Sequence, residues 1–177
     1  PTLTSLTLVT TCLAAAAGGV SAAFFASLLY KNYDITMFMN GVLGGLVGIT
    51  AGADLMSPTD SILIGIFAGI FVVLGISLIE KLKLDDPVGA IAVHLICGIW
   101  GTLAVGCFGD LAGTDQFFIQ LSGVAIIGAF CVITSFILLI IVKAVTGLRV
   151  SEEEEKKGLD LSEHSMEAYA DFRLNQL

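Results

Sequence analysis

The 177-residue chain is 56% hydrophobic and only 14% charged, with a mean hydropathy of +0.94. Soluble domains are about half apolar and a quarter charged, so this chain has too little polar surface to cover a globule in water. The composition excludes an ordinary soluble domain and a disordered protein, and it predicts an all-α polytopic membrane protein. Half of the sixteen acidic residues behind the net charge of −8 follow residue 150, and no basic stripe suggests a nucleic-acid partner.

Five apolar segments, each free of Asp, Glu, Lys and Arg in its interior, predict five transmembrane helices. The segments cover about residues 3–30, 35–53, 61–79, 87–108 and 117–142. We expect Pro58 in the first turn of the third helix, and Asp86 before Pro87 as the cap of the fourth. The sequence therefore predicts a transmembrane region over residues 1–146, followed by an acidic tail over residues 147–177.

Every Lys and Arg residue falls on the side of the predicted membrane region that carries the tail. The eight residues are Lys31, Lys81, Lys83, Lys143, Arg149, Lys156, Lys157 and Arg173. The loops on the opposite side, residues 54–60 and 109–116, contain none. By the positive-inside rule we expect a cytoplasmic tail and an outside start. We also expect a location in the plasma (cell inner) membrane. Pro1 is not a Met and the first helix begins almost at once, so we also expect a piece of a longer protein.

Two sets of small residues bear on packing. Cys12, Cys97, Cys107 and Cys131 lie far apart in apolar segments, which excludes a disulfide or metal framework and predicts small buried side chains. Three G-x-x-x-G motifs predict that neighbouring helix backbones approach closely. The motifs are Gly41/Gly45, Gly48/Gly52 and Gly65/Gly69. A tight bundle around a narrow pathway and ordinary helix packing both agree with these motifs.

His94 is the one ionisable residue deep within a predicted span. Such a group is costly in lipid, so we expect it to face a cavity or a partner. With an α-helical period, its face carries only small neighbours: Ala90, Cys97, Gly98 and Gly101. An imidazole beside open apolar volume suits the passage of a small neutral molecule and opposes a bare ion. A hydrogen bond that joins two helices is the alternative. A metal site is less expected, because no second His, Cys pair or carboxylate lies at i+3 or i+4.

Three motifs, in order along the chain, resemble the ammonium transporter and Rhesus superfamily. The run from Asp85 through Pro87 and His94 to Gly106 is very similar to the tenth helix of that family. The run from Asn40 to Gly52 resembles the eighth helix, and residues 147–169 resemble its cytoplasmic signature. Leu95 departs from the pattern, since many members have Gly there.

The resemblance implies that the five helices correspond to helices seven to eleven of an eleven-helix inverted-repeat transporter. It implies ammonium transport through a hydrophobic channel, in which ammonia passes two paired histidines. His94 matches the second histidine, while the first belongs to an N-terminal half on the same or a separate chain. The family forms homotrimers, so we expect further copies of the chain as partners. The other expected partners are ammonium or ammonia and membrane lipid.

Weaker assignments concern residues around this path and in the tail. Asn40 and Thr50 match positions near the family's pore, although interhelical hydrogen bonding explains them equally well. Asp86 either caps a helix or organises the pore entrance, and Trp100 either packs or gates. In the tail, the resemblance suggests that Arg149 pairs with acids of a neighbouring copy and that Ser162 carries a regulatory hydroxyl; a polar turn residue is the plainer interpretation of that serine.

Two classes of function remain open at this point. The leading hypothesis is transport, and the alternative is an ammonium sensor that signals through its tail to a cytoplasmic regulatory protein. No nucleophile–base pair, paired haem ligands or metal motif lies in the spans, so we expect neither an enzyme nor a bound cofactor. His164, in the acidic tail, is expected to be solvated.

Overall fold

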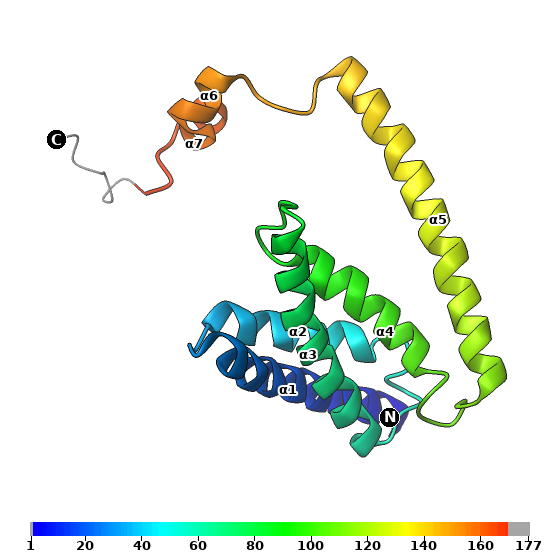
Figure 1. Ribbon diagram of the computed structural model, residues 1–177. Helices are drawn as coiled ribbons and strands as arrows, with labels where there is room; N and C mark the ends of the chain where they lie inside the picture. The colour runs from blue at the N-terminus through cyan, green and yellow to red at the C-terminus, as the bar shows by residue number, and fades with distance from the viewer. Residues whose placement is uncertain (1, 170–177) are drawn as a thin grey trace. The chain divides into compact units, whose positions relative to one another are not determined.

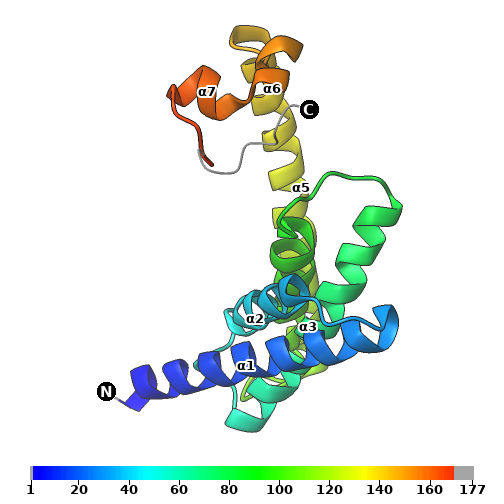
Figure 2. The ribbon, with the colours of Figure 1, turned by 90° about the vertical axis from the view of Figure 1, so that its left-hand side faces the viewer.

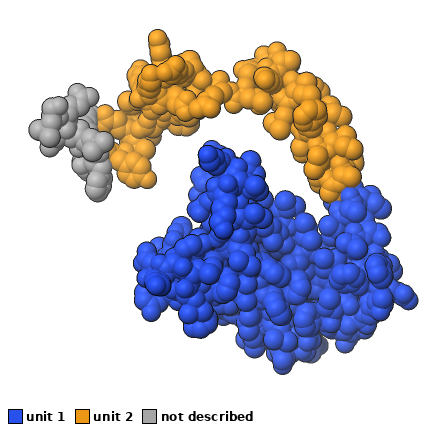
Figure 3. All heavy atoms as spheres, viewed as in Figure 1, with its two compact units in different colours: residues 1–127 blue, residues 128–177 orange. Residues whose placement is uncertain are grey.

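The computed structural model describes residues 2–169, and all regular secondary structure in that part is helical (Figures 1 and 2). In chain order the elements are α1 (Thr2–Tyr30), α2 (Ile35–Ile49), α3 (Pro58–Lys81), the π-helix η1 (Ile91–Ile96), α4 (Cys97–Ala104), α5 (Thr114–Val145), α6 (Glu152–Lys157) and α7 (Leu159–His164). The chain forms two compact units, with the boundary after Ile127, inside α5 (Figure 3). The expectation of an all-helical fold is confirmed.

Helices α1, α3 and α5 are each long and apolar enough to cross a membrane. The other two predicted spans are shorter than expected. α2 ends at Ile49 rather than near residue 53, and residues 50–55 form turns. The fourth predicted helix begins at Ile91 instead of Pro87, because a turn with a positive φ at Gly89 separates it from the proline. This helix ends at Ala104.

The beginnings of α2 and α3 follow from their capping residues. Ser57 caps α3 in a capping box: its hydroxyl accepts from the Asp60 N–H, the Asp60 carboxylate accepts from the Ser57 N–H, and Pro58 occupies the first turn. The predicted start of this helix is confirmed. The Asp34 carboxylate caps α2, accepting from the backbone N–H groups of Thr36 and Met37.

Small residues allow three helix backbones to touch. α1 packs against α2 and α3, and α2 packs against α3 and α4 (Figure 2). A Cβ added to Gly18 of α1 would lie 2.4 Å from the carbonyl oxygen of Gly41 in α2. A Cβ added to Gly65 of α3 would lie 2.3 Å from that of Ala14. The expected close approach is confirmed for Gly41/Gly45 and Gly65/Gly69, whereas Gly52 of the third motif lies in the turns after α2 and faces the Met56 side chain. Ala14, Gly18, Ala22 and Ala26 form a matching stripe of small residues on α1 that the sequence pattern had not indicated.

Side-chain hydroxyl groups add hydrogen bonds between these helices and the segments beside them. The fully buried Thr10 donates to the carbonyl oxygen of Ala53 at 2.7 Å, and Ser21 donates to that of Ile66 at 3.0 Å. Tyr30 and Ser77 share a hydrogen bond through their hydroxyl groups. In an apolar environment each such bond satisfies a polar group that is costly to leave unpaired.

Two expectations about burial require correction. Only Cys97 is buried; Cys12, Cys107 and Cys131 are exposed, because their positions lie on helix and loop faces that other described residues leave uncovered. α5 contains no buried residue over its whole length. In the second unit, α6 packs against α7, and Gly158 joins them with a φ of 100°.

The contact of α1 with α3 predicts a strong effect for Gly65→Val. The new side chain must displace the Ala14 carbonyl, which belongs to the backbone of a packed helix and cannot move aside alone. We expect destabilisation of about 1–3 kcal/mol or more, measured as a lower midpoint of thermal unfolding in detergent. Gly113→Ala is the matched control, since a Cβ there meets nothing within 4 Å. Equal midpoints for the two variants would contradict the packing described.

Candidate functional site

His94 lies in η1, and its side chain is exposed among the described residues. The residue before it, Val93, is buried against Ala68 and Val72 of α3. Leu95, which follows it, is 57% exposed. Among the described residues, the His94 side chain is therefore neither buried in the core of the first unit nor hydrogen-bonded to a neighbouring helix.

The small residues expected beside His94 do not form an open face. Cys97 is fully buried in the cluster with Val93, and a Cβ on Gly101 would lie 2.3 Å from the Gly48 carbonyl oxygen. Ala90 is exposed and Gly98 half-buried. The predicted face used α-helical spacing, whereas η1 is π-helical, so its wider turns separate His94 from Cys97 and Gly101.

Asp86 binds the start of this helix, but at a greater distance along the chain than expected. Its carboxylate accepts hydrogen bonds from the N–H groups of Ala90 at 2.7 Å and Ile91 at 2.9 Å. The carboxylate thus binds N–H groups at the start of η1, but Ala90 rather than Asp86 is the N-cap residue, and the helix begins four residues after Pro87.

Asn40 and Asp86 come together at one cavity of about 410 Å³. Its wall includes two further carboxylates, Asp34 and Glu80, and apolar side chains such as Met37. Hydrogen bonds from the Thr36 hydroxyl and from nearby backbone N–H groups lower the pKa of Asp34. His94 is not among the residues that line this cavity.

Thr50 and Trp100 lie away from this cavity. Thr50 is exposed after the end of α2, and its hydroxyl donates to the Leu46 carbonyl oxygen at 2.7 Å. The Trp100 indole donates to the Ile64 carbonyl oxygen at 3.1 Å. Its ring contacts Phe67 and Phe71 at centroid distances of 5.4 and 5.3 Å, so the described residues give it a packing environment.

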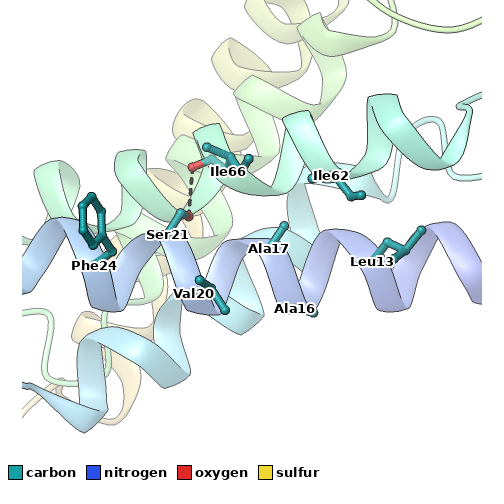
Figure 4. Close-up of a pocket in the computed structure, with 8 residues that line it drawn as sticks. All are labelled: Leu13, Ala16, Ala17, Val20, Ser21, Phe24, Ile62 and Ile66. Carbon is teal, nitrogen blue, oxygen red and sulfur yellow. Dashed lines mark hydrogen bonds between the residues drawn. The ribbon is translucent and has the colours of Figure 1, made fainter.

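An apolar groove between α1 and α3 gave no signal in the sequence analysis. It has a volume of about 510 Å³ (Figure 4). Its lining residues are Leu13, Ala16, Ala17, Val20, Ser21, Phe24, Ile62 and Ile66. The one hydroxyl in it, that of Ser21, is already bonded to the Ile66 carbonyl oxygen. The groove therefore offers apolar contact and no free polar group of its own lining side chains.

The tail residues interact within their own chain. Arg149 forms an ion pair with Glu155 of the same chain at 2.8 Å, whereas the resemblance suggested a pair with acids of a neighbouring copy. The hydrogen bond and the charge of Glu155 raise the pKa of Arg149. The Ser162 hydroxyl donates to the Gly158 carbonyl oxygen at 3.0 Å within α7. His164 is exposed, as expected. Within residues 2–169, no group of three or more His, Cys, Asp and Glu side chains is placed to hold a metal ion.

The capping box of α6 predicts a pH-dependent tail. Hydrogen bonds from the Ser151 hydroxyl and N–H lower the pKa of Glu154 below its ordinary value of 4.5. A depressed pKa means that the contribution to stability is present above pH 4.5 and is lost as the pH falls through the folded-state pKa. We expect α6 to persist at neutral pH and to fray in acid, observed by NMR titration of the Glu154 amide.

Ser151→Ala tests the same capping box. Without the hydroxyl donor, the pKa of Glu154 moves back toward 4.5, and α6 frays at a higher pH. Ser162→Ala is the matched control because that hydroxyl lies on α7 and does not contact Glu154. A Glu154 titration that is the same in both variants would refute the assigned cause.

Comparisons with known proteins agree with these features. A model of the Ammonium Transporter Family matches residues 2–169. The chain is 43% identical over 163 residues to a putative ammonium transporter of Synechocystis, covering 91% of this chain and 37% of that protein. It is 41% identical over 177 residues to the ammonium transporter Amt2 of Archaeoglobus fulgidus, covering 90% of this chain and 38% of that protein.

Solved structures give the same result. A protein described as "Sensor Amt Protein" is 34% identical, with a TM-score of 0.87 over 92% of this chain and 42% of that chain. Mep2 of Saccharomyces cerevisiae is 24% identical, with a TM-score of 0.79 over 85% of this chain and 38% of its own, which shows a shared fold. The sequence spans about two fifths of the length of its curated relatives. This chain belongs to the ammonium transporter family.

Proposed function

We propose that this chain takes part in ammonium transport across a membrane, with His94 as one of two paired histidines along the path. The match of residues 2–169 to the family model carries this proposal. It is supported by the position of His94, which is the ionisable residue within the apolar run from Ile91 to Ala104 and is left uncovered by the described residues.

The chemistry of the site favours ammonia over ammonium inside the path. Moving an unpaired cation into apolar surroundings costs far more free energy than moving a neutral molecule of the same size. Ammonium therefore has to lose its proton before it passes the apolar section. A neutral imidazole offers one donor and one acceptor, so it can bind ammonia by a hydrogen bond and can also relay a proton.

The second histidine is proposed to come from outside the 177 residues. Curated relatives are more than twice as long as the segment matched here, so the rest of the path would be supplied by the same polypeptide or by a separate one. The complete assembly is proposed to be a homotrimer in the plasma membrane. The 177 residues are proposed to cross the membrane with five helices and to place the tail in the cytoplasm. Regulation is proposed to act on the tail through Arg149 and Ser162, with a cytoplasmic protein as the partner.

His94→Ala tests the proposal directly. In proteoliposomes that contain the complete assembly, we expect the rate of ammonium flux to fall at least about tenfold. A positioned side chain that donates or accepts a proton typically raises the rate of a reaction by about 10² to 10⁴. Ile99→Ala is the matched control, since Ile99 is also exposed on α4 and carries no polar group. Flux equal to that of the unsubstituted protein would refute the role of His94. We also expect the 177 residues alone to conduct no ammonium selectively.

A sensor is the second candidate function. The similarity to the protein described as "Sensor Amt Protein" favours it, as do the two short helices of the tail, α6 and α7. The two functions are separated by measuring flux and an ammonium-dependent signal in the same His94→Ala cells. If the protein is a transporter, the ammonium-dependent signal is lost together with flux. If it is a sensor, the signal remains when flux is lost. Deleting residues 147–177 from a sensor should abolish the ammonium-dependent signal and leave flux unchanged.

A further inference from the structure

Another cavity of the first unit, also of about 410 Å³, lies where α1 begins and α2 ends. Three threonines and one carboxylate supply its polar side chains. Thr4 and Thr7 come from α1, Thr50 follows the end of α2, and Asp54 belongs to the turn after it. His94 does not line this cavity. We call it the threonine cavity, and its polar groups are separate from the histidine.

The turn that carries Asp54 is fixed to α1. The fully buried Thr10 donates to the carbonyl oxygen of Ala53 at 2.7 Å, and Ala53 itself is buried against the neighbouring core. Asp54 follows directly and is exposed, as is Thr50. A packed backbone therefore holds the carboxylate beside the threonines and leaves it open to water.

The hydroxyl groups of the threonine cavity present acceptors. The Thr7 hydroxyl donates to the Leu3 carbonyl oxygen at 3.0 Å, and the Thr50 hydroxyl donates to the Leu46 carbonyl oxygen at 2.7 Å. A hydroxyl has one hydrogen and two lone pairs, so both oxygens can still accept a hydrogen bond. Together with the carboxylate oxygens, they form a lining to which a ligand can donate.

The Asp54 carboxylate has no partner of its own. Within residues 2–169 it accepts no hydrogen bond and forms no ion pair, whereas the Asp34 and Asp60 carboxylates cap helices. Residues 2–30 and 35–80 contain no Lys or Arg. Lys31 follows the far end of the 29-residue α1, about 40 Å away along the helix. Screening at physiological salt acts over about 8 Å, so the negative charge of the cavity is not compensated.

A small monovalent cation fits this lining best. Sites for divalent ions usually combine several carboxylates, and the cavity has one. Among the described residues no group of three His, Cys, Asp and Glu side chains could hold a metal ion. An anion would meet lone pairs and like charge. Ammonium carries one positive charge and four N–H donors, so it can bind a carboxylate and several hydroxyl oxygens at once.

We propose that the threonine cavity is a binding site for ammonium, in which Asp54 supplies the charge and the hydroxyl oxygens of Thr7 and Thr50 accept N–H groups. Its use in transport, to collect ammonium before the cation loses its proton, rests on the proposed function. Binding itself does not, so the two can be tested separately.

The test is a titration of the complete assembly with ammonium chloride, followed by NMR of the ¹³C-labelled Ala53 methyl group, with sodium chloride as the reference. We expect a saturable shift with ammonium alone. Asp54→Asn should weaken the affinity about two- to fivefold, the range that one exposed charge pair provides. Asp110→Asn is the matched control, because it removes the same charge from an exposed loop residue that does not line the cavity.

Thr7→Val separates the site from general attraction by negative charge. It removes one acceptor oxygen and leaves the net charge unchanged, and we expect weaker ammonium binding. Thr134→Val is its control, since that hydroxyl also donates to a carbonyl oxygen four residues earlier, on α5. Asp54→Asn should also raise the ammonium concentration at half-maximal flux by a factor similar to its loss of affinity.

The outcomes are distinct. Equal methyl shifts with ammonium and sodium, or equal losses of affinity in Asp54→Asn and Asp110→Asn, would overturn the proposal and leave a surface that attracts any counter-ion. Saturable binding that Asp54→Asn weakens, in a protein whose flux survives His94→Ala, would support the site and refute the proposed function. Flux that His94→Ala abolishes, without any ammonium-dependent shift at Ala53, would do the reverse.

Discussion

The close approach of the α1, α2 and α3 backbones is the constraint on which the first unit depends. Apolar side chains gain little by exchanging lipid for protein, so helices in a membrane associate through close packing and hydrogen bonds. Gly18, Gly41 and Gly65 allow that packing, because a methyl group at any of them would collide with an opposing helix. The buried hydroxyls of Thr10 and Ser21 bind carbonyl oxygens of neighbouring segments and tie the same surfaces together.

This packed scaffold determines which face of η1 and α4 is buried. Gly101 lies directly on the Gly48 backbone and Cys97 lies against Ala68, so the helix cannot rotate about its axis without breaking both contacts. The direction of His94 therefore depends on backbone packing on the far side of its own helix.

The sequence predicts the apolar segments, their order and the start of α3, because absence of charge over some 20 residues and the Ser57-Pro58 cap are local properties. It also indicates His94 and Asp86 as residues of interest. It fails for the fourth helix, where a constant α-helical period places Cys97 and Gly101 beside His94. The segment Ile91–Ile96 is instead a π-helix, which the apolar pattern of the sequence does not distinguish from an α-helix.

Two kinds of exposed surface remain in the described residues, and they differ in what can cover them. The aliphatic side chains of α5, such as Ile137 and Leu138, are exposed, and lipid can cover them without loss of free energy. His94 is different, because an imidazole in hydrocarbon leaves a donor and an acceptor unpaired. Water or a polar group from outside the first unit must meet it. The direction of one side chain thus separates the face of the first unit that needs a polar neighbour from apolar surfaces that lipid alone can satisfy.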